Sequence, residues 1–380
     1  MSKLPSKQSW KEAASLIILA PDDRPKSNLS KKFDYSSLMV KRSVTSSFFA
    51  SAYVFPGGQV EISDLEYKWY ELFKKYGVEL NDLNLISDDI VGPRPPMVTD
   101  PITLRGQSMD LKTINMDIGL RISAIRETFE EAGILLLVDP KNRNNDYCKV
   151  LTSKSLNSDL NEWRKKVRSD AGKFIELCDT LRMVPDVWSL YEWSNWLTPI
   201  SVGHRRFDTM FYVCCFEQKP PVFVDNAEVT TPIWCNPIEI LEEHRLDQAF
   251  LAPPQVYELS RFLRFPMMDR LYRFMRSRQT LGCQRWLPVF LTYNDGGLSL
   301  VPGDEQYPAE PELVSNGKQI PEINGSVHDA NRETKSKNRM ELMGIKCRAI
   351  CTVEPGCGHV PPITYPSDDS DEQSKPIAKL

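Results

Sequence analysis

The sequence predicts an α+β fold in which a mixed β-sheet carries helices on its faces. Three observations lead to this prediction: short strand-like apolar runs near the N-terminus, one strongly patterned helix in the middle of the chain, and a helical lobe in the second half. Strands and helices that cluster in separate parts of a chain, without strict alternation, are typical of this class.

The first strands are expected at residues 15–21, 36–43 and 50–58. These runs, "SLIILAP", "SSLMVKRS" and "ASAYVFPGG", are short and apolar, and the third ends in a Pro-Gly-Gly turn. The character then changes over about 65–119, where one amphipathic helix precedes the proline-rich stretch "VGPRPPMVTDP". We interpret 65–119 as an insertion.

The patterned helix is expected over about 118–132. Asp117 is a suitable N-cap residue, and Gly133 is a typical C-terminal stop before the apolar run "ILLLV". The prediction for the whole chain is a domain at 1–305 with helical additions at about 155–200 and 237–280, a strand at 205–217, a hairpin around the "NDGG" at 294–297, a flexible loop at 306–340, returning strands at 341–365, and a disordered tail at 366–380.

Composition bounds the function. With 41% hydrophobic residues among 380, the chain can bury a large core. Forty-seven basic residues stand against 51 acidic ones, a net charge of -4, so nothing in the charge balance predicts a nucleic-acid or membrane-surface partner. No apolar run approaches the roughly eighteen residues of a membrane span. We therefore expect a soluble protein that acts on a small molecule.

Both ends of the chain bear on location. The N-terminus has no apolar signal core, so the nine cysteines are expected to be free thiols. Cys347, Cys351, Cys357 and His359 match no common zinc spacing, which favours partly buried thiols over a metal site. The final Ala378–Leu380, "AKL", has the form of a peroxisomal address, which predicts a peroxisomal import receptor as partner.

Three glutamates share one arc of the patterned helix. At about 100° per residue, Glu127, Glu130 and Glu131 fall within about a quarter turn, and Arg126 lies beside Glu130. Such a group is often the solvated face of an amphipathic helix. Its like charges repel one another, however, and a divalent cation with oxygen ligands, Mg²⁺ or Mn²⁺, would remove that repulsion. Geometry alone leaves both interpretations open.

The stretch "RETFEEAGI", residues 126–134, resembles the second half of the Nudix box, G-x5-E-x7-R-E-U-x-E-E-x-G-U, where U is a bulky apolar residue. The first half is similar to the stretch from Gly58 to Asp64, with aspartate in place of glutamate. Between Asp64 and Arg126 stand 61 residues where the pattern has seven. The resemblance implies a Nudix α/β/α sandwich with a mixed sheet, a long insertion inside the box and a C-terminal helical lobe.

A split box resembles one branch of this family, the peroxisomal coenzyme A diphosphatases. The stretch "LMVKRSVTSSFFASAYVFPGG", 38–58, aligns with that branch without a gap. The resemblance implies metal-dependent hydrolysis of the diphosphate bond of coenzyme A and acyl-CoA, giving 3′,5′-ADP and (acyl-)4′-phosphopantetheine. Two alternatives remain: a Nudix hydrolase for another nucleoside diphosphate, such as NADH or ADP-ribose, and a non-catalytic nucleotide-binding protein.

The resemblance also implies roles for individual residues. It makes Glu130 and Glu131 direct metal ligands, Glu127 a ligand or general base, and Arg126 an orienting partner. Gly57 and Gly58 are expected to let the backbone approach closely, and the Gly58 carbonyl to complete the metal shell.

Coenzyme A carries several phosphates, for which Lys41, Arg42, Arg205 and Arg206 are the candidate cations. Lys41 and Arg42 alternate along a strand, so only one can face the site, and Arg42 matches the family position. The alternative interpretation of Arg205 and Arg206 is a pair of surface residues at the end of a strand, without a role in phosphate binding. Glu228 is expected as an extra catalytic carboxylate, with a solvated loop residue as the alternative.

Overall fold

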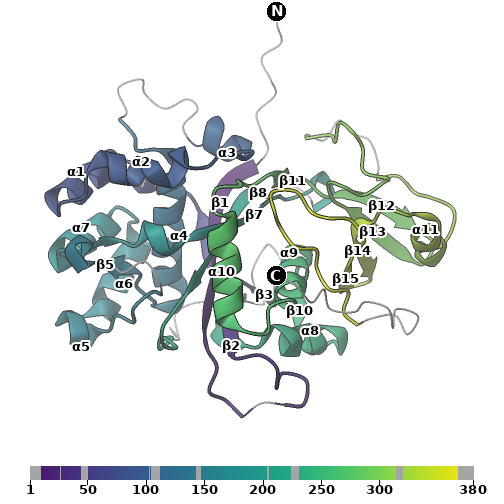
Figure 1. Ribbon diagram of the computed structural model, residues 1–380, viewed down its shortest axis with the longest axis horizontal. Coiled ribbons are helices and arrows are strands. Elements are labelled where there is room, and N and C mark those ends of the chain that lie inside the picture. Colours follow the sequence, from purple (N-terminus) through teal and green to yellow (C-terminus); the bar gives the residue numbers. More distant parts are fainter. Residues whose placement is uncertain are drawn as a thin grey trace, which may run out of the picture.

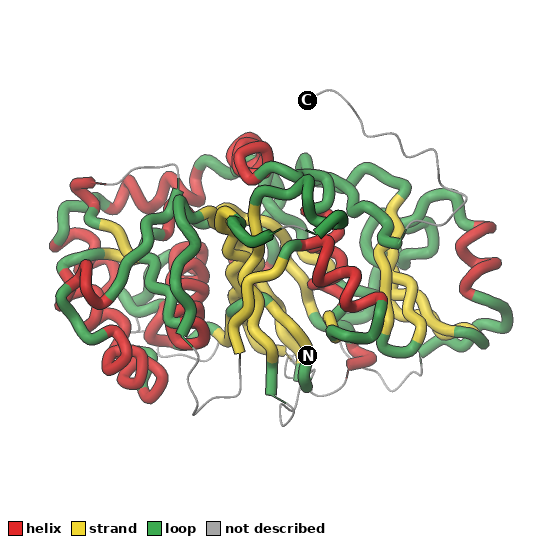
Figure 2. Tube along the Cα trace, turned by 90° about the horizontal axis from the view of Figure 1, so that it is seen from below, coloured by secondary structure: helices red, strands yellow, loops and turns green. Residues whose placement is uncertain are grey.

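The computed structural model describes residues 10–25, 27–43, 50–101, 103, 112–142, 147–202, 205–223, 231–313 and 320–366. A large sheet runs through the centre of the molecule, with helices on both of its faces, and a smaller sheet lies to one side (Figure 1). The view from below shows the same order, with strands between the two helical layers (Figure 2). This arrangement is the predicted α/β/α sandwich.

Within the described residues, the central sheet has nine strands in the order β10-β3-β2-β1-β8-β7-β11, with β4 on β1 and β9 on β2. The pairs β1–β8, β3–β10 and β7–β11 are parallel and the others antiparallel, so the sheet is mixed as predicted. The strands are β1 (Trp10–Pro21), β2 (Tyr35–Lys41), β3 (Ala52–Val54), β4 (Gly57–Gln59), β7 (Tyr191–Leu197), β8 (Arg206–Cys215), β9 (Thr231–Cys235), β10 (Phe250–Leu251) and β11 (Arg285–Trp286).

Strand β1 divides the core into two halves. Because side chains alternate along a strand, Leu16 and Ile18 enter one buried cluster and Ile17 and Leu19 the other. The first cluster is covered by α4 (Met116–Ala132) and the second by α9 (Pro253–Phe262) and α10 (Met268–Arg278). A near-continuous apolar strand is what a sheet covered on both faces requires.

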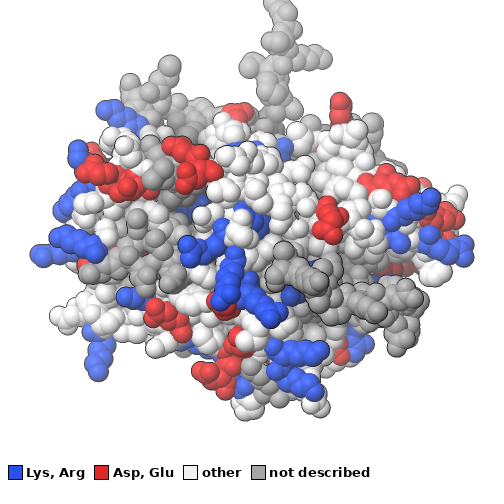
Figure 3. Space-filling model, viewed as in Figure 1, with Lys and Arg blue, Asp and Glu red and all other residues white. Residues whose placement is uncertain are grey.

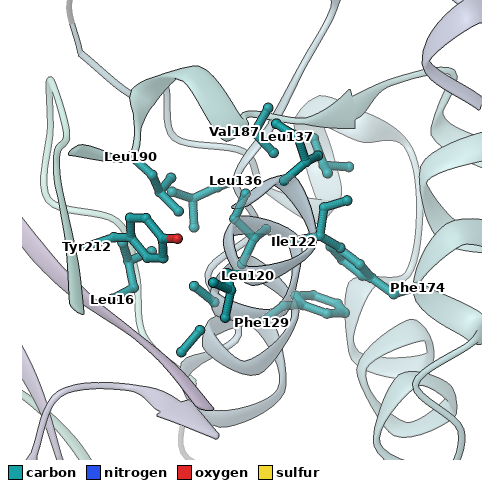
Figure 4. Close-up of a cluster of buried hydrophobic side chains, with 14 of the residues drawn as sticks. Leu16, Leu120, Ile122, Phe129, Leu136, Leu137, Phe174, Val187, Leu190 and Tyr212 are labelled. Atoms are coloured by element: carbon teal, nitrogen blue, oxygen red, sulfur yellow. The ribbon is translucent and has the colours of Figure 1, made fainter. Parts of the chain in front are cut away.

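Helix α4 is buried on several sides, so its acidic face is not the solvated face that was one of the two interpretations of the sequence. In Figure 4, Leu120 points toward Leu16 of the sheet, whereas Phe129 points toward Phe174 of the outer layer. That outer layer consists of α1 (Lys68–Lys75), α2 (Leu80–Asp88), α5 (Ser153–Leu156), α6 (Leu160–Ser169) and α7 (Lys173–Leu181). It makes α4 the central helix of this half of the protein.

The insertion is anchored to α4 by buried charges. Asp117 was predicted to cap the helix, but this prediction is wrong. The N-cap residue is Asn115, whose side chain accepts the backbone N–H of Asp117. The Asp117 carboxylate is paired with Arg94 of the insertion, and Arg94 Nη1 also lies 2.6 Å from Glu192 Oε1 of β7. The insertion also contributes the short helix α3 (Pro96–Thr99), which lies within the proline-rich stretch.

Two other elements differ from the sequence prediction. The helical addition predicted at about 155–200 contains two main helices, α6 and α7, because the chain turns at Asp170, whose side chain accepts the N–H of Gly172 at 2.9 Å, and it ends in strand β7. The apolar run at 134–138 contributes only the short strand β5 (Leu137–Val138), paired with β6 (Val184–Pro185). Ile134, Leu135 and Leu136 lie before the strand and are buried in the same core cluster as α4, and the Leu136 carbonyl accepts the N–H of Asp186 at 3.1 Å.

The C-terminal part forms a four-stranded antiparallel sheet of its own. Its strands are β12 (Val289–Tyr293), β13 (Gly296–Leu300), β14 (Asn338–Met343) and β15 (Lys346–Cys351), in that order. The predicted hairpin is β12–β13. Strand β15 packs against α9 and against α8 (Pro237–Arg245), so the small sheet rests on the helices that cover the second face of the large one.

The loop predicted at 306–340 is wrong in part. Ser326 caps α11 (Val327–Glu333), and β14 begins at Asn338. Arg339 is fully buried and forms a bidentate pair with Asp304 at 2.6 Å for both contacts. Polarity was mistaken here for exposure, because the partner that neutralises Arg339 lies 35 positions away.

The cysteines are in the state that the sequence predicts, and the surface charge differs from one region to another. All nine cysteines are free thiols, and seven are buried. On the face drawn in Figure 3, basic side chains gather over α10, whereas acidic and basic groups are mixed over the outer helices and the C-terminal sheet. Among the described residues, no helix combines the length and the hydropathy that a membrane crossing requires.

Candidate active site

The glycine turn and α4 meet beside β1. Ser15 and Ala14 of β1 pair with Gly57 and Gly58 of β4, and the Ser15 hydroxyl donates to the Pro56 carbonyl at 2.9 Å. A Cβ on Gly57 would lie 2.4 Å from the Ala14 carbonyl oxygen, so only glycine fits there. The Gly57 N–H donates to Glu131 Oε2 at 3.0 Å, which joins the turn to the helix.

Arg126 closes the split motif. Its guanidinium forms two parallel bonds to Asp64, Nε to Oδ1 at 2.7 Å and Nη2 to Oδ2 at 2.8 Å, across 62 positions of sequence. The Nη1 group donates to Glu127 Oε1 at 2.9 Å and to Glu130 Oε1 at 2.5 Å. Asp64 therefore occupies a place beside the glutamate helix despite the insertion, and Arg126 orients three carboxylates.

The three glutamates do not share one environment. Glu127 and Glu131 line a cavity, together with Gly57 and Gly58. The Glu130 carboxylate is turned to Arg126, and Glu130 is not among the residues that line the cavity. The repulsion expected among the glutamates is relieved for Glu127 and Glu130 by Arg126, an i,i+4 partner in the case of Glu130.

Burial controls the protonation of this cluster. It raises the pKa of Glu127 to about 8, with Arg126 acting in the opposite direction and the neighbouring carboxylates adding to the rise. Burial also raises the pKa of Glu130, again opposed by Arg126. The ionised forms of Glu127 and Glu130 are therefore costly until a further cation offsets their charge.

Two arginines that the sequence analysis missed hold the end of α4. Gly133 ends the helix in a left-handed conformation, φ 71°, which leaves the last carbonyls open to other donors. Arg164 donates to the Glu130 carbonyl at 2.8 Å and to the Glu131 carbonyl at 2.7 Å, and Arg168 donates to the Glu130 carbonyl at 2.9 Å. Both belong to α6. Their spacing shows that they share a helical face, but nothing local shows which carbonyls they reach.

The cavity has a volume of about 670 Å³ and extends from the carboxylates to the C-terminal sheet. Its size suits a nucleotide-sized ligand. Among the described residues, none from the insertion at 65–119 lines it. Apart from the acidic end, its walls are mainly apolar and include Phe55, Trp196, Leu197, Phe207, Phe211, Phe250, Leu251, Pro253, Pro254, Pro288, Phe290, Leu342 and Ile345.

The predicted phosphate-binding cations lie in three different environments. Arg42 and Arg205 line the cavity, whereas Lys41 is exposed and lies 5.3 Å over the ring of Tyr53. Arg206 does not line the cavity. Its buried guanidinium donates to the backbone carbonyls of Thr198 and Leu313, both at 2.7 Å, which corrects the expectation of a substrate contact. Glu228 and Ala378–Leu380 lie outside the described residues.

The donors that face the cavity fit a divalent cation. Among the described residues, no three His, Cys, Asp or Glu side chains are grouped as a ready-made metal centre. Glu127 and Glu131 nevertheless bring carboxylate oxygens to the cavity beside the backbone of Gly58, and hard oxygen donors suit Mg²⁺ and Mn²⁺. The raised pKa of Glu127 adds to the fit, because a cation would offset its buried charge. Glu130, expected as a direct ligand, is held by Arg126 instead.

Gly58→Ala is expected to lower activity by at least about tenfold, because the new Cβ would lie 2.4 Å from the carboxyl carbon of Glu127 and would displace that side chain. Steady-state kinetics on the purified variant would measure the loss. Gly356→Ala is the matched control, since a Cβ there meets only Gln284 Oε1, at 4.0 Å. Equal activity in the two variants would contradict the close approach of Gly58 to Glu127.

Comparisons with known proteins agree on one family. A family model described as the NUDT19 Nudix domain matches residues 10–262, and one described as the NUDT19 C-terminal domain matches residues 290–352. The second match coincides with the four-stranded sheet from β12 to β15.

Named relatives match most of the chain. The acyl-coenzyme A diphosphatase NUDT19 of Xenopus laevis is 35% identical over 381 residues, which cover 96% of this chain and 98% of that protein. Proteins of the same name from Gallus gallus and Homo sapiens are 36% and 34% identical, covering 98% and 82% of this chain and 99% and 84% of theirs. Among solved structures, a Nudix hydrolase from Alicyclobacillus acidocaldarius aligns with a TM-score of 0.48 and 19% identity over 70% of this chain and 97% of that one.

Proposed function

The chain belongs to the Nudix hydrolases, in the family of the NUDT19 Nudix domain, and on that premise we propose that it hydrolyses the diphosphate bond of coenzyme A and acyl-CoA. The products would be 3′,5′-ADP and 4′-phosphopantetheine or its acylated form. The observation that carries the proposal is that two motif carboxylates, two arginines and a long apolar wall line one cavity.

Each part of the cavity suits a part of this substrate. Arg42 and Arg205 supply positive charge for phosphates, as guanidinium groups commonly do. The apolar wall suits the pantetheine arm and an attached acyl chain. Asp64 supports catalysis over the non-catalytic alternative, because its bidentate contact with Arg126 shows that the insertion leaves the motif assembled.

The chain's own residues would position the reaction. Nudix hydrolases generally use divalent metals, and such an ion, held by Glu127, Glu131 and the Gly58 carbonyl, would neutralise phosphoryl oxygens and activate water. Arg126 holds Glu127 Oε1 in place, and the glycine turn leaves room for that carboxylate. Attack of water on one phosphorus breaks the P–O–P bond, and Glu127 would accept a proton of that water in the case where Glu131 and the Gly58 carbonyl hold the ion without it.

A substrate panel tests the proposed function. The purified protein would be incubated with coenzyme A, acyl-CoA, NADH and ADP-ribose in the presence of Mg²⁺ or Mn²⁺, and the products identified by mass. The expected products from coenzyme A are 3′,5′-ADP and 4′-phosphopantetheine. Faster turnover of NADH or ADP-ribose would assign a different nucleoside diphosphate, and binding without turnover of any of the four would indicate a non-catalytic protein. The same panel decides between the two metals.

Metal binding is expected to release a proton at neutral pH. Burial raises the pKa of Glu127 from the ordinary range of a glutamate to about 8, so in the metal-free protein this carboxyl group keeps its proton up to that range. A cation needs the carboxylate form, so its affinity should rise with pH and level off above about 8. Titration calorimetry in buffers of different ionisation enthalpy would measure the released proton.

The control for this effect is Glu127→Gln, which has no proton to release and should bind the cation more weakly with a flatter pH dependence.

In the metal-free protein the carboxyl group of Glu127 favours folding at low pH, since the folded form keeps a proton that the unfolded chain loses above about 4.5. Without metal, the wild-type protein should therefore lose stability relative to Glu127→Gln as the pH rises from about 4.5 to about 8. A wild-type stability that rises relative to that variant across this window would contradict the raised pKa.

We also propose a peroxisomal location, with Ala378–Leu380 bound by an import receptor. The support is the form of this tripeptide, together with the resemblance of the split motif to a peroxisomal branch. A fluorescent protein fused in front of the chain should co-localise with a peroxisomal marker and become diffuse when the tripeptide is deleted. An unchanged distribution after the deletion would overturn this assignment.

A further inference from the structure

The turn between β14 and β15 reaches the cavity from the C-terminal sheet. Leu342, Gly344, Ile345, Lys346 and Cys347 all line the cavity, at the side formed by the small sheet. They form one β-hairpin with a two-residue turn, Gly344 and Ile345, between Met343 and Lys346. Gly344 has φ 64° with no Cβ contact within 4 Å, so the turn, and not a packing contact, requires the glycine.

Two contacts fasten this hairpin to the Nudix half of the protein. Lys346 Nζ lies 2.7 Å from Asp247 Oδ2, in the turn after α8. The Cys347 N–H donates to Nε2 of the buried His244 at 3.2 Å, and His244 Nδ1 lies 3.0 Å from the Ala249 carbonyl. The next two residues, β10, also line the cavity. The hairpin is therefore held beside the cavity wall, chiefly by the buried hydrogen bond to His244.

The tip of the hairpin is apolar and exposed to solvent. Ile345 is 62% exposed although it lines the cavity, so it lies where the cavity meets solvent. Leu342 and Phe290 line the same cavity, whose acidic end is formed by Glu127 and Glu131. An aliphatic edge that opens to water suits a flexible chain of variable length, because added methylene groups can extend outward. The flat, polar adenine ring gains less from such an edge.

We propose that the β14–β15 turn selects the acyl chain of the substrate, with Ile345 as the specificity-determining residue at the outer end and Leu342 further in. This inference rests on the proposed function and extends it, since it assigns the acyl-recognition surface to the C-terminal sheet. The chain of an acyl-CoA lies along Leu342 and Ile345, whereas free coenzyme A ends before reaching them. Each buried methylene contributes roughly a three- to fourfold gain in affinity.

The test compares free coenzyme A with decanoyl-CoA in two variants of the full-length protein. Ile345→Asp should raise KM for decanoyl-CoA at least about tenfold, with KM for coenzyme A changed less than about twofold. Met343→Asp is the matched control, because Met343 is 53% exposed on the same hairpin but does not line the cavity. It should leave both KM values within about twofold. Ile345→Ala, which adds no charge, should give an intermediate loss for decanoyl-CoA.

Several outcomes would overturn the inference. An equal loss for both substrates in Ile345→Asp would mean that the tip touches the part they share, and no loss would mean that the chain lies elsewhere. Direct binding of both ligands, measured by calorimetry, separates this inference from the proposed function. If the wild-type protein hydrolyses neither compound, the proposed function fails, whereas the difference in binding between Ile345→Asp and Met343→Asp still decides the inference.

Discussion

Glu127→Gln is expected to lower kcat for coenzyme A by about a hundred- to ten-thousandfold, the range typical for loss of a group that moves a proton. Glutamine keeps the size of the side chain but removes the negative charge and the proton-accepting oxygen. Glu127 lines the cavity and lies against Gly58, so the change falls at the reacting end of the site. Steady-state kinetics at saturating Mg²⁺ would measure it.

Glu130→Gln is the matched control for this prediction. Glu130 stands on the same helix, three residues on, but its carboxylate is bound to Arg126 at 2.5 Å and does not line the cavity. Its replacement should cost at least about tenfold less in kcat than the replacement of Glu127. Circular dichroism and thermal unfolding would show that both variants are folded. A larger loss in Glu130→Gln would restore the direct ligand role that the sequence implied for Glu130.

The local part of this site was predictable from the sequence, whereas the pairing of its side chains was not. The helix that carries Glu127 and Glu131 was expected because helical spacing and a C-terminal glycine are local signals. The environment of Glu130 depends on how the guanidinium of Arg126 is shared. Its Nε donates to Asp64, which leaves Nη1 to donate to Glu130 Oε1. Such competition is decided in three dimensions.

The site residues that the sequence analysis missed act through contacts between distant parts of the chain. Arg164 reaches the end of α4 across 34 positions, and Ile345 reaches the cavity from a separate sheet. Neither residue stands in a recognisable motif. The N-cap of α4 was misassigned for a related reason: Asp117 is a good capping residue, but Arg94 of the insertion pairs with its carboxylate, and Asn115 takes the cap. Tertiary charge pairing overrode local propensity.

The buried pair of Arg126 and Asp64 should be as important for folding as for activity. Arg126→Met would leave Asp64, Glu127 and Glu130 without their common cation, and breaking a buried ion pair in this way costs about 3–5 kcal/mol. The side chains of Arg126 and Asp64 are 3% and 1% exposed, so water cannot replace the lost partner. Guanidinium unfolding in the presence of EDTA would measure the change without help from a bound metal.

An exposed ion pair of the same protein provides the comparison. Lys165 and Glu162 are 2.8 Å apart, but their side chains are 67% and 56% exposed, so Lys165→Met should change stability by less than about 1 kcal/mol. Asp64→Asn should lie between the two, because Arg126 keeps its contacts with the glutamates. If Arg126→Met were no more destabilising than Lys165→Met, the two halves of the split motif would not be held together by this contact. Asp64 would then not replace the glutamate that the motif has at this position.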